Sequence, residues 1–144
     1  TEVPLYEGSA GPLLPNHSLQ LWPGHGSDGL GDSGLSDAAD CPAPQSTHAV
    51  TALIDIFKGR PGQIELLALG PLTNIALAAR LDPFFPSRVK HLTIMGGCES
   101  AQGNCSMTAE FNFFADPEAA HIVLDVFTRD KLLPPEAEAE ARAR

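Results

Sequence analysis

The sequence is poor in cysteine, and its cysteines are not spaced as in metal sites. It holds three cysteines in 144 residues, an odd number, and no two form a C-x-x-C pair. This pattern favours neither a disulfide framework nor a zinc site. We expect Cys41, Cys98 and Cys105 to be free, partly buried thiols.

Basic residues and long apolar runs are also scarce. Nine Lys and Arg stand against 18 Asp and Glu, giving a net charge of -9, so no nucleic acid is expected as a partner. No apolar stretch approaches the roughly 20 residues that span a bilayer, and the first residues do not resemble a signal peptide. With 43% hydrophobic residues, the composition predicts a globular, cytoplasmic protein that has no membrane partner.

The first 45 residues are rich in Gly and Pro and lack helical periodicity, so they are expected to form mostly loops. Val3–Tyr6 is predicted to be a short strand. Residues 24–32 gather four glycines around His25 and two aspartates. Such a loop either lets the backbone approach a ligand or simply turns, and the residues alone favour His25 as an ordinary surface residue.

Helical and strand patterns then alternate along the chain. A helix capped by Ser46 or Thr47 is expected to end at Gly59, next to Pro61. The apolar run 64–69 is typical of a strand covered on both faces in a parallel sheet. A helix over 72–81, a connection through 84–86, a strand over 91–95 and a helix over 117–127 are expected to follow.

This alternation predicts an α/β fold with an open, mostly parallel, Rossmann-like sheet flanked by helices. The predicted domain covers residues 1–131. Residues 132–144 form an Ala/Glu/Arg tract without an apolar face, which indicates a solvated tail.

Polar side chains concentrate after the second predicted strand, where α/β sheets bind ligands. Asn104, Glu110 and Asn112 can pair with hydroxyl groups, and no Lys or Arg lies between Lys90 and Arg129. The segment therefore favours a neutral polyol over a phosphate. The equally weighted alternative is an ordinary loop with a solvated Glu110.

Motifs in a fixed order give this sequence a family resemblance. They are LGPLTN at 69–74, MGG at 95–97, GN at 103–104, and AEFN followed by DPEAA between 109 and 120. Together with VPLY at 3–6 and HGSDGLG at 25–31, they resemble the middle portion of the inosine-uridine preferring nucleoside hydrolase family. The resemblance implies hydrolysis of ribonucleosides to ribose and free base.

The resemblance also implies a role for each matching residue. Asn112 would bond the ribose diol, and Asn104 and Glu110 would hold the 5′-hydroxyl side. Met95 would line the sugar pocket, and His25 would lie near the leaving base. We expect Asn104, Glu110 and Asn112 to converge on one pocket.

In the complete family site, Ca²⁺ binds the ribose hydroxyls and a water, and an Asp accepts the water's proton. The main-chain carbonyl of Leu69 would be one calcium ligand, at the edge of the predicted pocket. The family's Asp-rich first motif and its late His-Asp pair have no counterpart in this sequence. The catalytic base belongs to that first motif and is therefore expected upstream of Thr1, so that no catalytic residue is predicted here. The 144 residues alone are expected to bind no calcium and to be inactive.

Three hypotheses stay open at this point. The first is a nucleoside N-ribohydrolase acting on a ribonucleoside substrate. The second is a truncated or degenerate, non-catalytic isoform acting by binding or oligomerisation, with a homo-oligomer as one form. The third, an unrelated nucleotide-binding domain, is disfavoured because no G-x-G-x-x-G follows either strand.

Overall fold

The computed structural model describes residues 3–15, 23–34 and 43–129. The catalytic base is expected upstream of Thr1, and Thr1 itself lies outside these described residues. The position of that base stays a prediction. Cys41 and the predicted tail at 132–144 lie outside them as well. None of the described helices is both long enough and apolar enough to cross a bilayer.

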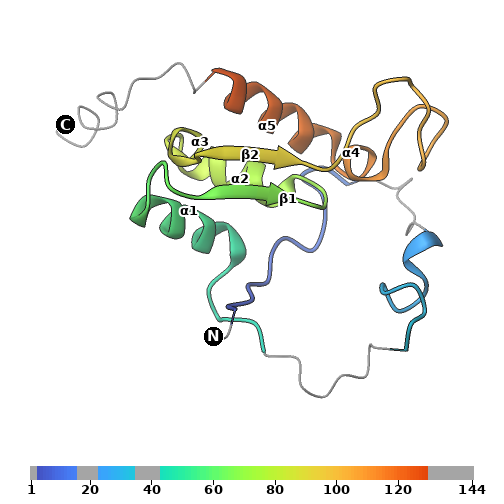
Figure 1. Cartoon of the computed structure of the whole chain (residues 1–144), viewed down its shortest axis with the longest axis horizontal. Coiled ribbons are helices and arrows are strands. Elements are labelled where there is room, and N and C mark those ends of the chain that lie inside the picture. Colours follow the sequence, from blue (N-terminus) through green and yellow to red (C-terminus); the bar gives the residue numbers. More distant parts are fainter. Residues whose placement is uncertain (1–2, 16–22, 35–42, 130–144) are drawn as a thin grey trace.

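Two short strands and several helices make up the described part of the chain (Figure 1). In chain order the elements are η1 (Pro23–His25), α1 (Ala49–Gly59), β1 (Glu65–Ala68), α2 (Thr73–Leu81), α3 (Phe85–Arg88), β2 (His91–Ile94), α4 (Phe111–Ala115) and α5 (Pro117–Arg129).

The strands β1 and β2 pair in parallel, as predicted. Their register runs from Glu65 opposite His91 to Ala68 opposite Ile94. Helices α2 and α3 connect them, and Figure 1 shows α2 behind the two strands and α3 at the end where β2 begins. Because the strands are parallel, their carboxyl ends lie together at one edge of the sheet.

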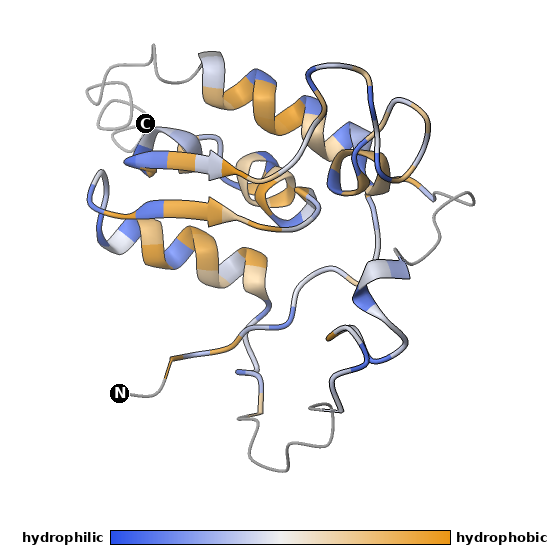
Figure 2. Cartoon of the chain, turned by 45° about the vertical axis from the view of Figure 1, so that its right-hand side comes forward, coloured by the Kyte–Doolittle hydropathy of each residue, from blue (hydrophilic) through white to orange (hydrophobic). Residues whose placement is uncertain are grey.

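The prediction that the first strand is covered on both faces is wrong for the described chain. Ala68 is buried and Leu66 packs against the core, but Leu67 and Leu69 are 60% and 61% exposed. Successive side chains of a strand point to opposite faces, so the described helices cover one face and leave the other open. In Figure 2, hydrophobic residues recur along the helices that flank the strands.

Phe85, which is fully buried, lies at the centre of the core. Its ring packs edge-on against Phe57 of α1 and Phe127 of α5, with centroid distances of 5.3 and 6.2 Å. Arg88, at the end of α3, donates to Asp82 at 2.6 Å and is almost completely buried. These contacts join α1, α3 and α5 into one packed unit.

Several local predictions need correction. Tyr6 forms only an isolated bridge with Gln45, so Val3–Tyr6 is not a strand. The N-cap of α1 is His48, one residue after Thr47, because its Nδ1 accepts from the Val50 N–H at 3.2 Å. The connection through 84–86 includes the short helix α3, in which Pro86 occupies the first turn, where no N–H is needed.

The last helix begins at Pro117 as predicted and continues to Arg129, two residues beyond the expected end. The segment before it, expected to be loop throughout, contains helix α4. This helix sits directly beside the carboxyl ends of both strands (Figure 1).

Candidate functional site

Asn112 connects the carboxyl ends of the two strands. It lies in α4 and is 6% exposed. Its Nδ2 donates to the Met95 carbonyl at 2.9 Å and reaches the Leu69 carbonyl at 3.5 Å. Both carbonyls belong to the residue that directly follows a strand. The predicted proximity of Asn112 to the Leu69 carbonyl is therefore confirmed.

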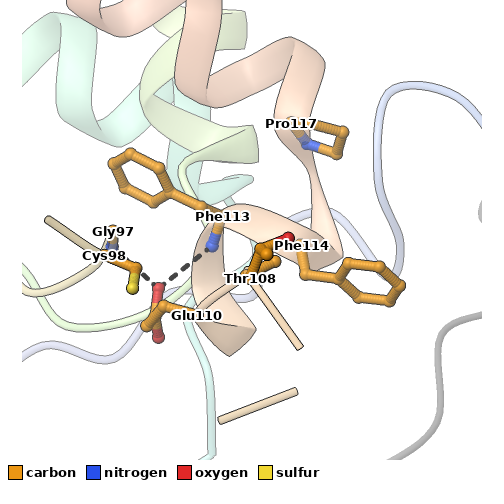
Figure 3. Close-up of a pocket in the computed structure, with 8 residues that line it drawn as sticks. Gly97, Cys98, Thr108, Glu110, Phe113, Phe114 and Pro117 are labelled. Carbon is orange, nitrogen blue, oxygen red and sulfur yellow. Dashed lines mark hydrogen bonds between the residues drawn. The ribbon is translucent and has the colours of Figure 1, made fainter. Parts of the chain in front are cut away.

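Glu110 is the N-cap of α4, and main-chain N–H groups occupy both of its oxygens. Oε1 accepts from Asn112 at 2.9 Å, and Oε2 accepts from Gly97 at 3.0 Å and from Phe113 at 3.2 Å (Figure 3). A carboxylate suits this place because the first N–H groups of a helix lack partners within the helix. Glu110 thus fastens α4 to the loop that leaves β2.

Asn104 holds the same helix from the other side of the loop. Its Oδ1 accepts from the Phe111 N–H at 2.8 Å. Asn104, Glu110 and Asn112 therefore meet at the start of α4, although in this structure each bonds to main-chain groups. They meet through different contacts, and their convergence on one ligand pocket stays a prediction.

A cavity of about 360 Å³ lies beside Glu110. Its walls include Cys98, Thr108, Phe113 and Phe114 (Figure 3). Neither Asn104 nor Asn112 is among its lining residues. Apolar groups make up most of the cavity's lining.

His25 is exposed, as its residue type alone predicted, and it also contacts α4. Its ring meets Phe111 edge-on at a centroid distance of 6.1 Å. The loop that follows is tightly bonded. The N–H of Leu30 lowers the pKa of Asp28, and the hydroxyl of Ser27 lowers the pKa of Asp32. This bonding holds the turn that carries His25.

Sequence reasoning missed two buried residues next to this cluster, Asp116 and Thr73. Asp116 is fully buried, and its Oδ2 accepts from the Thr73 hydroxyl at 2.6 Å and from the Leu13 N–H at 2.9 Å. Its Oδ1 accepts from the Ala119 N–H at 3.0 Å. The DPE sequence pointed only to a helix start, and nothing in the pattern signalled a long-range bond to α2.

The cluster is built from neutral donors and acceptors and one carboxylate. Within the described ranges, no three His, Cys, Asp or Glu side chains gather closely enough to hold a metal ion. Cys98 and Cys105 are free and partly buried, as predicted. The arrangement offers amide and carbonyl groups at the carboxyl edge of a parallel sheet, which suits hydroxyl groups of a ligand.

Comparison with known proteins decides the family. A family model described as "Inosine-uridine preferring nucleoside hydrolase" matches residues 1–139. The chain belongs to this nucleoside hydrolase family. It is 45% identical over 126 residues to "Probable uridine nucleosidase 1" of Oryza sativa subsp. japonica, covering 85% of this chain and 37% of that protein.

Further nucleoside hydrolases support the assignment. "Pyrimidine-specific ribonucleoside hydrolase RihB" of Escherichia coli O157:H7 is 38% identical over 125 residues, covering 84% of this chain and 37% of that protein. Among solved structures, "Plant nucleoside hydrolase - PpNRh1 enzyme" matches with a TM-score of 0.73 and 34% identity, over 86% of this chain and 39% of that chain.

A purine-preferring ribonucleoside hydrolase from Gardnerella vaginalis matches equally well in structure, with a TM-score of 0.73, 28% identity and coverage of 86% of this chain and 40% of that chain. Names that specify pyrimidines and purines thus both occur among the similar proteins. This nucleoside hydrolase chain spans about two fifths of the length of such relatives. Its α/β fold and its family agree with the predictions, and the non-catalytic alternative is not favoured.

Proposed function

We propose that the complete protein hydrolyses the N-glycosidic bond of ribonucleosides and that this chain supplies part of the ribose site. Hydrolysis adds water across the bond, so that the sugar carbon gains a hydroxyl group and the base nitrogen gains a proton. The observation that carries the proposal is Asn112, buried between the carbonyls of Leu69 and Met95 at the carboxyl edge of the sheet.

Each residue around α4 is given the role that the family resemblance implies. Asn112 forms hydrogen bonds with the ribose diol, while Asn104 and Glu110 hold the 5′-hydroxyl side of the sugar. Met95, which is 49% exposed, lines the sugar pocket. His25, which contacts Phe111, lies toward the leaving base. These roles rest on the family resemblance and stay predictions.

Calcium is proposed as the metal of the complete site, and the Leu69 carbonyl as one ligand. That carbonyl fits the role of a hard oxygen ligand, because its hydrogen bond to Asn112 is long at 3.5 Å. Ca²⁺ takes about 6–8 oxygen ligands, and the described residues present no group of carboxylates around Leu69. Bound calcium would lower the pKa of a water molecule. This chain's own contribution is to hold the carbonyl and Asn112 in place.

The test is a graft into a longer relative. The 144 residues replace the matching segment of the rice probable uridine nucleosidase 1, and ribose release from uridine and inosine is followed. In the active graft, we expect Asn112→Ala to lower kcat on the order of 10²-fold, because a hydroxyl bond that strengthens in the transition state contributes to rate.

A matched control is Ser87→Ala, which removes a hydroxyl bond to the Phe84 carbonyl in α3, at the opposite end of the strands. Its kcat should stay near that of the graft. Equal kcat values for the Asn112→Ala and Ser87→Ala grafts would contradict the role of Asn112. A folded graft without any ribose release would contradict the proposed activity.

Two further parts of the proposal need separate measurements. Calorimetric titration of the 144-residue chain with Ca²⁺ is expected to give no binding, since a single carbonyl is a weak site; saturable binding would contradict this part. Homo-oligomerisation stays a prediction, which light scattering of the complete protein would decide.

A further inference from the structure

Two segments run side by side next to the candidate site and are joined at both ends. Residues 69–73 lead from β1 into α2, and residues 112–116 comprise most of α4 and Asp116, the residue between α4 and α5. Asn112 bonds to the Leu69 carbonyl at one end, and Asp116 bonds to the Thr73 hydroxyl at the other. Both bonds join residues 43 positions apart, so the second bond repeats the first after a shift of four residues.

The two bonds differ in strength. The Thr73 to Asp116 bond measures 2.6 Å and is buried, with Thr73 5% exposed and Asp116 fully buried. The contact between Asn112 Nδ2 and the Leu69 carbonyl measures 3.5 Å, at the limit for a hydrogen bond. The short, charge-assisted bond is therefore the one able to set the spacing of the segments.

Asp116 also has further partners that hold it in place. Its Oδ2 accepts from the Leu13 N–H and its Oδ1 from the Ala119 N–H at the start of α5. A buried carboxylate is costly unless its oxygens are paired, and these donors occupy both oxygens of Asp116. The carboxylate is thus anchored to three parts of the chain at once, and the Thr73 hydroxyl is its link to α2.

We propose that Thr73 and Asp116 are positioning residues for the candidate ribose site: their buried bond fixes the separation between the Leu69 carbonyl and the Asn112 amide. Neither side chain needs to touch a ligand to do this. Displacements of about 1 Å in a reacting geometry can cost on the order of 10²-fold in rate. The consequence for activity rests on the proposed function, whereas the consequence for Asn112 does not.

The first test observes Asn112 directly in the 144-residue chain. The ¹⁵N side-chain amide signals of Asn112 are identified by their loss in Asn112→Asp. Thr73→Val removes the hydroxyl and keeps the shape of the side chain, and Thr73→Ser keeps a hydroxyl. We expect Thr73→Val to shift the Asn112 amide signals and to speed their hydrogen exchange about tenfold, and Thr73→Ser to restore both.

The matched control is Thr128→Val, which removes a hydroxyl bond to the Leu124 carbonyl in α5. It should leave the Asn112 signals unchanged. If Thr73→Val melts earlier but leaves these signals in place, the bond serves stability only and the proposal is wrong. If Thr73→Val does not fold, Thr73→Ala takes its place; failure of both to fold would also overturn a role specific to Asn112.

The second test uses the graft described above. Thr73→Val is expected to lower kcat about tenfold or more with KM changed less than threefold, with recovery in Thr73→Ser. An unchanged kcat in an active graft would overturn the link to the reaction. Thr73→Val could shift the Asn112 signals in the 144-residue chain while the unsubstituted graft releases no ribose. That result would contradict the proposed function but would support the positioning of Asn112 by Thr73.

Discussion

Replacement of Gly96 by alanine tests whether the loop after β2 is packed as described. A Cβ on Gly96 would lie 2.8 and 2.9 Å from two ring carbons of Phe113 and 3.2 Å from Oε2 of Glu110. Carbon atoms ordinarily approach to about 3.5–4.0 Å, so the ring would have to move by roughly 1 Å. That movement would disturb the Glu110 oxygen, which accepts from Gly97 and Phe113.

The magnitude is the balance of two effects. Overpacking of this kind costs about 1–3 kcal/mol, while the lower entropy of the unfolded alanine chain returns about 0.4–1 kcal/mol. We expect Gly96→Ala to lower the free energy of unfolding by about 0.5–2 kcal/mol. The thermal midpoint should fall by roughly 2–4 °C per kcal/mol for a chain of this size.

Gly70 provides a matched control, because it follows Leu69 after β1 as Gly96 follows Met95 after β2. A Cβ on Gly70 meets nothing within 4 Å, and its φ is not in the left-handed region. Gly70→Ala should therefore stabilise the chain by about 0.4–1 kcal/mol. Urea unfolding followed by circular dichroism measures both variants. Equal midpoints for the two would refute the packing of Phe113 against Gly96.

Two further predictions concern charged groups. Burial raises the pKa of Asp82, but the bond from Arg88 and the Phe84 N–H outweigh this and leave it below its ordinary value of 3.8. The Asp82 carboxylate therefore contributes to the free energy of unfolding above its unfolded pKa, and this contribution is lost as pH falls through the folded pKa. Asp82→Asn should lower the free energy of unfolding by about 1.5–3 kcal/mol at pH 7 and flatten the fall of stability at acid pH. An unchanged fall of stability at acid pH would contradict this role of Asp82. Glu110→Gln should lower the free energy of unfolding, measured in urea, by about 1–3 kcal/mol, because the NH₂ group of the glutamine must face a main-chain N–H donor. Glu99 lies exposed in the same loop, and Glu99→Gln should change the free energy of unfolding little. Equal effects of the two substitutions would contradict the capping role of Glu110.

The pairing of β1 and β2 was predictable because the signal is local and strong. Each strand is a short apolar run bounded by turn residues and separated by a helical pattern, and this combination favours parallel strands with a crossover. The position of Asn112 near Leu69 followed from that topology, since both strands end at one edge of the sheet. Periodicity therefore sufficed for the frame of the site.

Helix α4 was not predictable by the same means. It is five residues long, too short for an apolar period to appear, and its N-cap is Glu110, which is not among the usual capping residues Ser, Thr, Asp and Asn. The helix forms because Glu110 accepts from the Asn112 and Phe113 N–H groups. Its stability thus depends on a contact that spacing alone does not reveal.

The exposed face of β1 was missed for a different reason. A continuous apolar run indicates burial on both faces, but it does not state which segments provide the cover. In the described residues only the face carrying Leu66 and Ala68 is packed, while Leu67 stays 60% exposed. The apolar composition of a strand predicts that both of its faces can be buried. The tertiary packing decides which faces other segments actually cover.

The hydrogen bonds around α4 indicate where the candidate site can adapt to a ligand. A carboxylate offers about four acceptor positions, and Glu110 uses three of them on main-chain N–H groups, so one hydroxyl can be added without breaking a bond. The Nδ2 of Asn112 already has both carbonyls as partners, and the weaker partner is Leu69 at 3.5 Å. Replacing the bond between Asn112 and the Leu69 carbonyl with a bond to a ligand therefore costs the least free energy. A sugar hydroxyl or a cation can therefore be accommodated at the Leu69 carbonyl while the short bonds to Met95 and within α4 remain.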